Sequence, residues 1–353
     1  MKIFLKSYSS DYFCRNNTER LKGGLALAVL LHHLYQKTNI VGHDSLLGFF
    51  MQSLGYYCVS LFFFISGFGL IMSANRGGYL QTYQRNRVLP IFVINAIFVI
   101  VFVIEKFLFG VEVTFNNVLM SLTYGGDIVE NGWFLLCIII FYELFYLSAR
   151  FSSTHICKCI FTLTIAYMSI AVCLGMSVWW YISSLAFPCG VLFGSYKLDV
   201  DKHVRKNKTF FMVMSAVLFI ICFLSIYWLR IEDVDNGMCM HYIISIITLS
   251  LSVIHGLLAC FLVVVLLMMF GRYVNREGKV VNKLSTIYLE IYVMQGAAFL
   301  LLRNSIWNLN NDILFALISV MLTVVFALVI HPIFKIILSA IKVRNNNYKE
   351  ING

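Results

Sequence analysis

The chain has 353 residues, of which 60% are hydrophobic and 12% charged, and its mean hydropathy is +0.83. Ordinary soluble domains are about a quarter charged, so this composition excludes a water-soluble fold and indicates a polytopic membrane protein. The net charge of +10 does not indicate nucleic-acid binding, because the basic residues lie in short loops between apolar runs. The cysteines are scattered without metal-ligand spacing, so we expect no metal site.

Ten apolar runs are long enough for membrane helices, each of which needs about 20 residues. We therefore expect an all-α protein with ten transmembrane helices. Pro332 predicts a kink in the last of them. The expected spans are roughly 22–40, 46–73, 89–109, 131–149, 156–174, 178–196, 209–229, 242–270, 284–302 and 313–341.

The distribution of basic residues predicts the orientation of these spans. Four of the 27 lysines and arginines fall in the predicted outer loops, namely Lys37, Lys106, Arg230 and Arg303. By the positive-inside rule both termini are cytoplasmic, with an N-terminal segment at about 1–21 and a C-terminal tail at about 342–353. We expect one transmembrane domain over 1–353, with no signal peptide and no appended soluble domain.

Two histidines interrupt the first apolar run, which opens with Lys22. At 1.5 Å per residue His33 lies roughly 16 Å from Lys22, near the middle of a hydrocarbon core about 30 Å thick. An ionisable side chain at that depth indicates a functional site, and a neutral imidazole there can accept a proton from a hydroxyl. The alternative is an imidazole bonded to a neighbouring helix. His32 is about 100° away around the helix, so at most one of the two faces the reaction.

Arg85 and Arg87 precede Pro90, a residue that suits the first turn of a helix. Guanidinium groups and backbone N–H groups at a helix N-terminus make a phosphate site, here on the predicted cytoplasmic side. The alternative is that both arginines only anchor the chain at the inner face of the membrane.

Glu143 and Glu290 are acids within apolar runs. Each must be protonated, paired or facing water. Glu290 enters from the predicted cytoplasmic face, where it could orient a histidine or a basic residue. Glu143 could equally be a structural hydrogen-bond partner.

Four sets of residues resemble the motifs of a known family, in that family's order. They are Lys22 with ten residues before His33, the segment Phe62–Phe68, the segment Arg85–Pro90, and Trp133-Phe134 together with Ser285–Gln295. In these positions the chain resembles the integral-membrane acyltransferase family 3, bacterial O-acyltransferases that modify surface glycans. The resemblance covers nearly the whole chain.

This resemblance implies an enzyme that moves an acyl group, expected to be acetyl, from acetyl-CoA to a hydroxyl of a glycan or lipid-linked saccharide. The enzyme would lie in the bacterial cytoplasmic membrane and hold no permanent cofactor. By the resemblance His33 would be catalytic, and Lys22, Arg85 and Arg87 would hold the donor. Glu290 is a second catalytic candidate because of its position in an apolar run, not because of the resemblance. Many members of the family have a histidine where this chain has Gln295, so Gln295 receives no catalytic role.

A second function, from a different class, is compatible with the same residues. A transporter or flippase for a polysaccharide precursor or organic anion would use His33, Glu143 and Glu290 for proton coupling or substrate contact. Such a protein would not bind coenzyme A. A third interpretation is a non-catalytic membrane component of an export complex.

Overall fold

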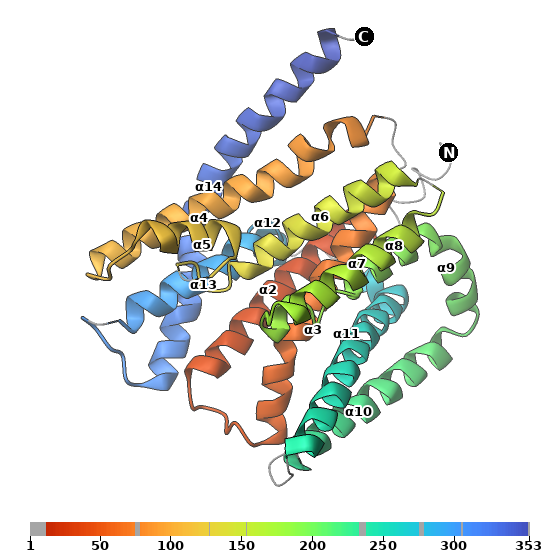
Figure 1. The fold of residues 1–353 in the computed structure, drawn as a ribbon, viewed down its shortest axis with the longest axis horizontal. Coiled ribbons are helices and arrows are strands. Elements are labelled where there is room, and N and C mark those ends of the chain that lie inside the picture. The colour runs from red at the N-terminus through yellow and green to blue at the C-terminus, as the bar shows by residue number, and fades with distance from the viewer. Residues whose placement is uncertain are drawn as a thin grey trace. The chain divides into compact units, whose positions relative to one another are not determined.

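The structure, a computed structural model, describes residues 12–74, 78–126, 128–152, 154–232, 238–274, 279–304 and 306–351. Most of the expected N-terminal segment and the last two residues of the expected C-terminal tail lie outside these ranges. Within them the chain is helical (Figure 1), and its β-structure is an isolated antiparallel bridge between Arg303 and Asn308. The all-α prediction is confirmed.

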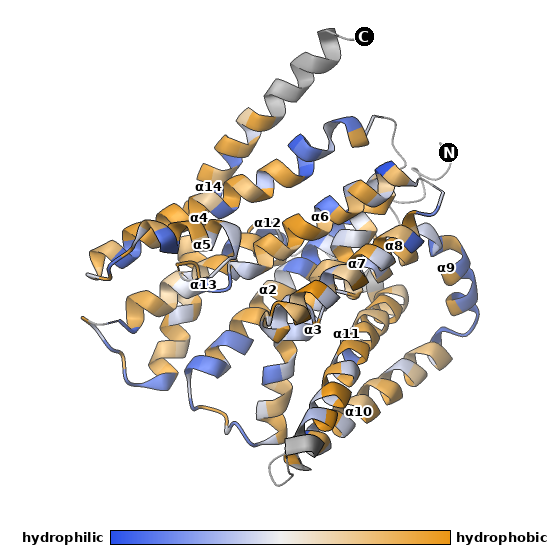
Figure 2. Cartoon of the chain, viewed as in Figure 1, coloured by the Kyte–Doolittle hydropathy of each residue, from blue (hydrophilic) through white to orange (hydrophobic). Residues whose placement is uncertain are grey.

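Seven helices of the described chain are long and apolar enough to cross a membrane. Hydrophobic residues cover most of their length in Figure 2, and the protein is therefore a multi-pass membrane protein. The helices are α3 (Leu46–Ala74), α4 (Leu89–Leu108) with the preceding turn η2 (Gln84–Val88), α6 (Trp133–Phe151), α7 (Ile156–Cys173), α10 (Lys208–Glu232), α11 (Met238–Val274) and α14 (Asp312–Ile351).

The other three expected spans form shorter or more polar elements. The first is α2 (Arg15–Lys37), whose N-terminal half is polar. The sixth is divided into a short 3₁₀ turn, η3 (Val178–Trp180), and a helix of 10 residues, α8 (Ala186–Ser195). The ninth is divided into α12 (Lys279–Thr286) and α13 (Tyr288–Leu302), the latter 15 residues long. The count of ten spans and the cytoplasmic position of the termini therefore stay predictions.

Three small elements complete the chain. They are the 3₁₀ turn η1 (Leu80–Thr82), α5 (Phe115–Thr123) and α9 (Lys197–Lys206). Thr114 caps α5, because its side chain accepts a hydrogen bond from the backbone of Asn117 while the Asn117 side chain accepts one from the backbone of Thr114.

The chain divides into two compact units. Unit 1 comprises Met1–His32, Val41–Met72 and Phe161–Thr286, and unit 2 comprises His33–Ile40, Ser73–Ile160 and Ile287–Gly353. The start of α2 thus belongs to unit 1, while its last turn, which begins at His33, belongs to unit 2.

In unit 1, α3 and α8 approach each other at two glycines. A Cβ atom at Gly67 would collide with the carbonyl oxygen of Phe187, and one at Gly190 would collide with the carbonyl oxygen of Phe64. Small residues permit such backbone contact between membrane helices. Gly67 belongs to the Phe62–Phe68 segment, so the glycine of that segment has a packing role.

In unit 2, α13 and α14 pack as an antiparallel pair. Phe299 contacts Phe315 near one end of the pair, with ring centroids 5.7 Å apart, and Glu290 contacts His331 near the other. The helix α4 packs on both, and its Phe98 ring meets Phe334 edge to face. Pro332 lies inside α14, which continues past it to Ile351.

Candidate active site

The beginning of α2 is anchored to α12 within unit 1. Arg20 is buried, and its Nε donates a hydrogen bond to Asn282 Oδ1 at 3.0 Å. At Gly23 an added Cβ would lie 3.1 Å from the backbone of Ser285, so the two segments are in backbone contact. Lys22 is half-buried beside this contact. The first and last sequence motifs therefore meet at Gly23 and Ser285.

The two adjacent histidines of α2 have different surroundings. His32 is buried, and its Nδ1–H donates to the carbonyl oxygen of Met51 on α3 at 2.8 Å. A Cβ atom at Gly55 would lie 2.6 Å from His32 Nε2, so the ring fills the space that a side chain would need. His32 is thus a packed structural residue, whereas His33 is partly exposed.

The His33 ring is oriented from its own helix. His33 Nδ1 lies 3.0 Å from Gln36 Oε1, one turn further along α2. With the amide oxygen assigned to this contact, Nδ1 carries the hydrogen and Nε2 carries the lone pair. Fixing one ring nitrogen in this way sets the role of the other. In this tautomer Nε2 is able to accept a proton.

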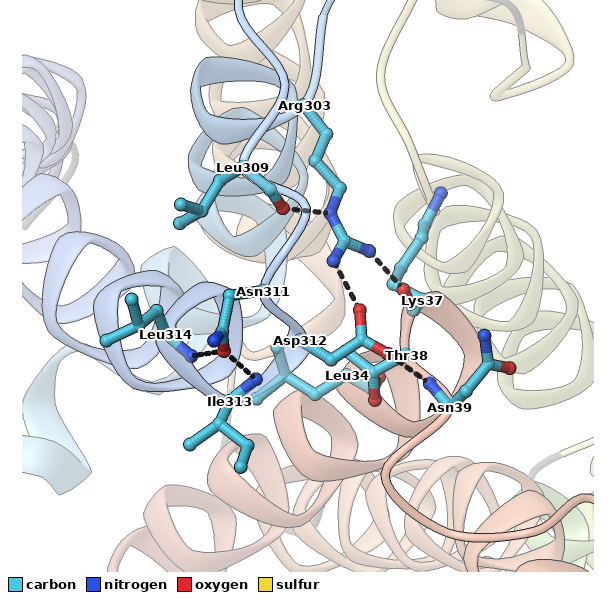
Figure 3. Close-up of polar contacts among 10 residues, drawn as sticks. All are labelled: Leu34, Lys37, Thr38, Asn39, Arg303, Leu309, Asn311, Asp312, Ile313 and Leu314. Atoms are coloured by element: carbon cyan, nitrogen blue, oxygen red, sulfur yellow. Dashed lines mark hydrogen bonds and ion pairs between the residues drawn. The ribbon is translucent and has the colours of Figure 1, made fainter.

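An ion-pair network holds the C-terminal end of α2 in unit 2 (Figure 3). Arg303 donates to the carbonyl oxygens of Lys37 and Leu309, and its Nη2 pairs with Asp312 Oδ1 at 2.5 Å. Asp312 Oδ2 accepts the backbone N–H of Asn39 at 2.7 Å. In addition, Lys37 Nζ pairs with Glu130 Oε1 at 2.7 Å. The sequence indicated Lys37 and Arg303 only as outer-loop charges.

Arg85 and Arg87 lie at the N-terminus of α4, which begins at Leu89 as the sequence predicted, and they do so within a π-helical turn. The π-helical turn Gln84–Val88 runs directly into α4, and the backbone N–H of Leu89 bonds the carbonyl of Gln84. Pro90 has no N–H, so it cannot continue the regular pattern of hydrogen bonds, and a wider turn forms there. The arginines thus occupy the first turn of the long helix.

The two arginines have different partners within unit 2. Arg87 donates from Nε to the hydroxyl of Tyr79 at 3.0 Å and from Nη2 to Ser73 Oγ at 3.4 Å, and it lies over the Tyr79 ring. Arg85 is half-buried and has no partner among the residues that the structure describes. Helical residues two positions apart do not share a face. The structure therefore leaves Arg85 better placed than Arg87 to meet a ligand.

Glu290 pairs with a histidine, as the sequence allowed. It is buried in the first turn of α13, and its Oε1 lies 2.7 Å from His331 Nδ1 on α14. The sequence did not indicate which histidine this would be. Their juxtaposition pairs a buried acid with a partly exposed imidazole.

Glu143 and Gln295 have structural partners. Glu143 Oε2 accepts a hydrogen bond from Gln84 Nε2 at 2.7 Å, which connects α6 with the turn that carries the arginines. Gln295 is fully buried and donates to the carbonyl of Tyr292 at 2.6 Å. In the described ranges, no three histidines, cysteines or acids gather as metal ligands would.

The protein is thus a multi-pass membrane protein in which α2 carries the His33 imidazole and the turn before α4 carries two arginines. Residues 17–331 match the acyltransferase 3 family, whose model is described as an acyltransferase domain. This stretch contains most of the chain, so the protein belongs to the acyltransferase 3 family and is a membrane acyltransferase. No curated protein and no solved structure matches the chain.

Proposed function

We propose that the protein is an O-acyltransferase of the bacterial cytoplasmic membrane that moves an acetyl group from acetyl-CoA to a hydroxyl of a cell-surface glycan or lipid-linked saccharide. The observation that carries this proposal is the His33 imidazole, whose Nδ1 is engaged by Gln36 so that Nε2 can accept a proton. An acyl transfer to a hydroxyl needs such a base.

His33 acts on the acceptor in the proposed reaction. Its Nε2 takes the proton of the acceptor hydroxyl while the oxygen attacks the thioester carbonyl carbon. The carbon–sulfur bond then breaks, the acyl ester forms, and the coenzyme A thiolate leaves and regains a proton. In a second route Nε2 itself attacks the thioester, and an acyl-imidazole passes the group to the hydroxyl. Trapping of labelled acyl-enzyme before acceptor is added separates the two routes.

Arg85 is the main contact for the donor in this proposal. Its guanidinium suits the phosphate groups of acetyl-CoA, which arrive from the cytoplasm. Arg87 bonds the side chains of Tyr79 and Ser73 instead. The topology that accompanies the proposal has ten crossings and cytoplasmic termini, with the first, sixth and ninth crossings formed by the shorter or more polar helices.

The proposal is tested with membranes that contain the wild-type protein or His33→Ala and are given acetyl-labelled coenzyme A. Label is expected in the saccharide fraction of the wild type and not of His33→Ala. The matched control is His203→Ala, which removes an exposed histidine whose Nδ1 bonds the carbonyl oxygen of Asp199 in its own helix. Full labelling with His33→Ala would contradict the proposed mechanism.

Transport of a polysaccharide precursor is the alternative, and the pairing of Glu290 with His331 is the observation that favours it. The two functions differ in their ligand. A ligand that binds only the folded state raises the unfolding temperature by mass action, so acetyl-CoA should stabilise the purified acyltransferase. Absence of both stabilisation and label transfer would favour the transporter.

A further inference from the structure

We propose that Arg303 and Asp312 are positioning residues for His33. This inference rests on the proposed function, because it assigns them a role in the transfer step. Together they bind the two peptide groups that flank Thr38, directly after α2. Arg303 Nη1 donates to the carbonyl oxygen of Lys37, and Asp312 Oδ2 accepts the N–H of Asn39 (Figure 3).

The guanidinium of Arg303 is fixed along its edges and on one face. Its Nε donates to the carbonyl oxygen of Leu309 at 3.0 Å, and its Nη2 pairs with Asp312 Oδ1 at 2.5 Å. Its central carbon lies 3.9 Å from the centre of the Phe315 ring, within the range of a cation–π contact. Three contacts outside α2 thus hold this side chain, so its bond to the Lys37 carbonyl can keep the end of α2 in one place.

The Lys37 carbonyl that Arg303 binds belongs to the same helical turn as His33, the proposed base. In an α-helix the N–H of Lys37 bonds the carbonyl of His33, so Lys37 closes the turn that His33 begins. The last carbonyls of a helix lack helical partners, and a cation at that end stabilises them. Gln36, which orients the His33 ring, lies in the same turn. Without the contacts of Arg303 this turn is expected to fray, and the imidazole loses its fixed direction.

The test measures transfer and donor binding separately in Arg303→Lys and Asp312→Asn. Lysine keeps the charge but lacks the planar fork that reaches several acceptors, and asparagine keeps the shape but loses the charge. We expect kcat to fall about 10- to 100-fold, as misplacement of a catalytic group does, with an unchanged KM for acetyl-CoA and unchanged stabilisation by it. The control is Arg15→Ala, which breaks the exposed Arg15–Glu19 pair at the other end of α2 and should leave kcat unchanged.

A double variant distinguishes positioning from general support of the fold. If Arg303 acts through the turn of His33, Arg303→Lys should cost less in a Gln36→Ala background than in the wild type. The inference would be overturned if Arg303→Lys and Gln36→Ala lowered kcat independently, so that their fold-losses multiply. It would also be overturned if kcat fell only in proportion to the folded fraction. Wild-type kcat in both single variants, with His33→Ala inactive, overturns it as well. Activity of His33→Ala instead overturns the proposed function on which it rests.

Discussion

His331 Nδ1 lies 2.7 Å from Glu290 Oε1, which connects α14 with the first turn of α13 within unit 2. An acid buried at this position is stabilised by a partner, and removal of either residue leaves the other with an unmatched polar group. The pair is therefore expected to behave as a unit.

The first prediction concerns this pair. Glu290→Gln and His331→Gln should each lower the transfer rate, and the double variant should be little worse than either single variant, because members of one unit are not additive. Transfer rates of the three variants in matched membranes check this. Additive losses would mean that the two side chains act separately.

The second prediction separates the two arginines of the π-helical turn. Arg85→Ala should raise the KM for acetyl-CoA about 10-fold or more with little change in the unfolding temperature, because a charged hydrogen bond to phosphate contributes about 1.5–3 kcal/mol. Arg87→Ala should lower the unfolding temperature as well, since it loses the contacts with Tyr79 and Ser73. The control is Arg150→Ala, which removes an exposed arginine at the end of α6. Equal KM effects of Arg85→Ala and Arg150→Ala would remove Arg85 from the donor site.

The third prediction compares two glycines on α3. Gly67→Ala should destabilise the protein by about 3 kcal/mol or more, because the new methyl group meets the backbone carbonyl of Phe187, which cannot move aside like a flexible side chain. Gly69→Ala, two residues further on, meets nothing within 4 Å and should be neutral or slightly stabilising in a helix. Thermal unfolding in detergent measures both. A similar loss in the two variants would contradict the close approach of α3 and α8.

The fourth prediction distinguishes the adjacent histidines. His32→Ala removes a buried ring and its bond to Met51, so the unfolding free energy should fall by about 2–4 kcal/mol. His33→Ala removes a partly exposed ring and should change stability much less while abolishing transfer. Unfolding curves and transfer rates of the two variants are measured side by side. His32→Ala should lose more stability, and His33→Ala should lose more transfer activity. If His32→Ala lost transfer without losing stability, His32 would be the catalytic histidine and His33 the structural one.

The long helices could be predicted from apolar runs. The run at 46–73 became α3 (Leu46–Ala74), and that at 156–174 became α7 (Ile156–Cys173). The breaks within 178–196 and 284–302 could not be predicted, because the polar residues next to them, Ser183-Ser184 and Ser285-Thr286, are types that membrane helices tolerate. In the second run the break is a change of backbone direction at Ile287, which has φ −117° and ψ 19°. No residue type in that sequence requires it.

The site was predictable in its residue types and less so in its contacts. The sequence identified His33 and Glu290 because ionisable groups are rare in apolar runs. It indicated Arg303 only as a loop charge and not as a contact of α2, because Lys37 is 266 positions away in the chain. Nor could it decide that His32 is used for packing, since Gly55, the residue that makes room for its ring, looks like any other glycine of a membrane helix.

Pro332 has a mechanical consequence for α14. A proline has no N–H, so the carbonyl of Leu328 lacks its usual helical donor, and the helix is weakest against bending at this point. The contact between His331 and Glu290 lies immediately before it. A load applied to the far end of α14 is therefore expected to bend the helix at Pro332 before it disturbs that contact. The end of α14 is accordingly a suitable place to attach a fusion partner or an affinity tag.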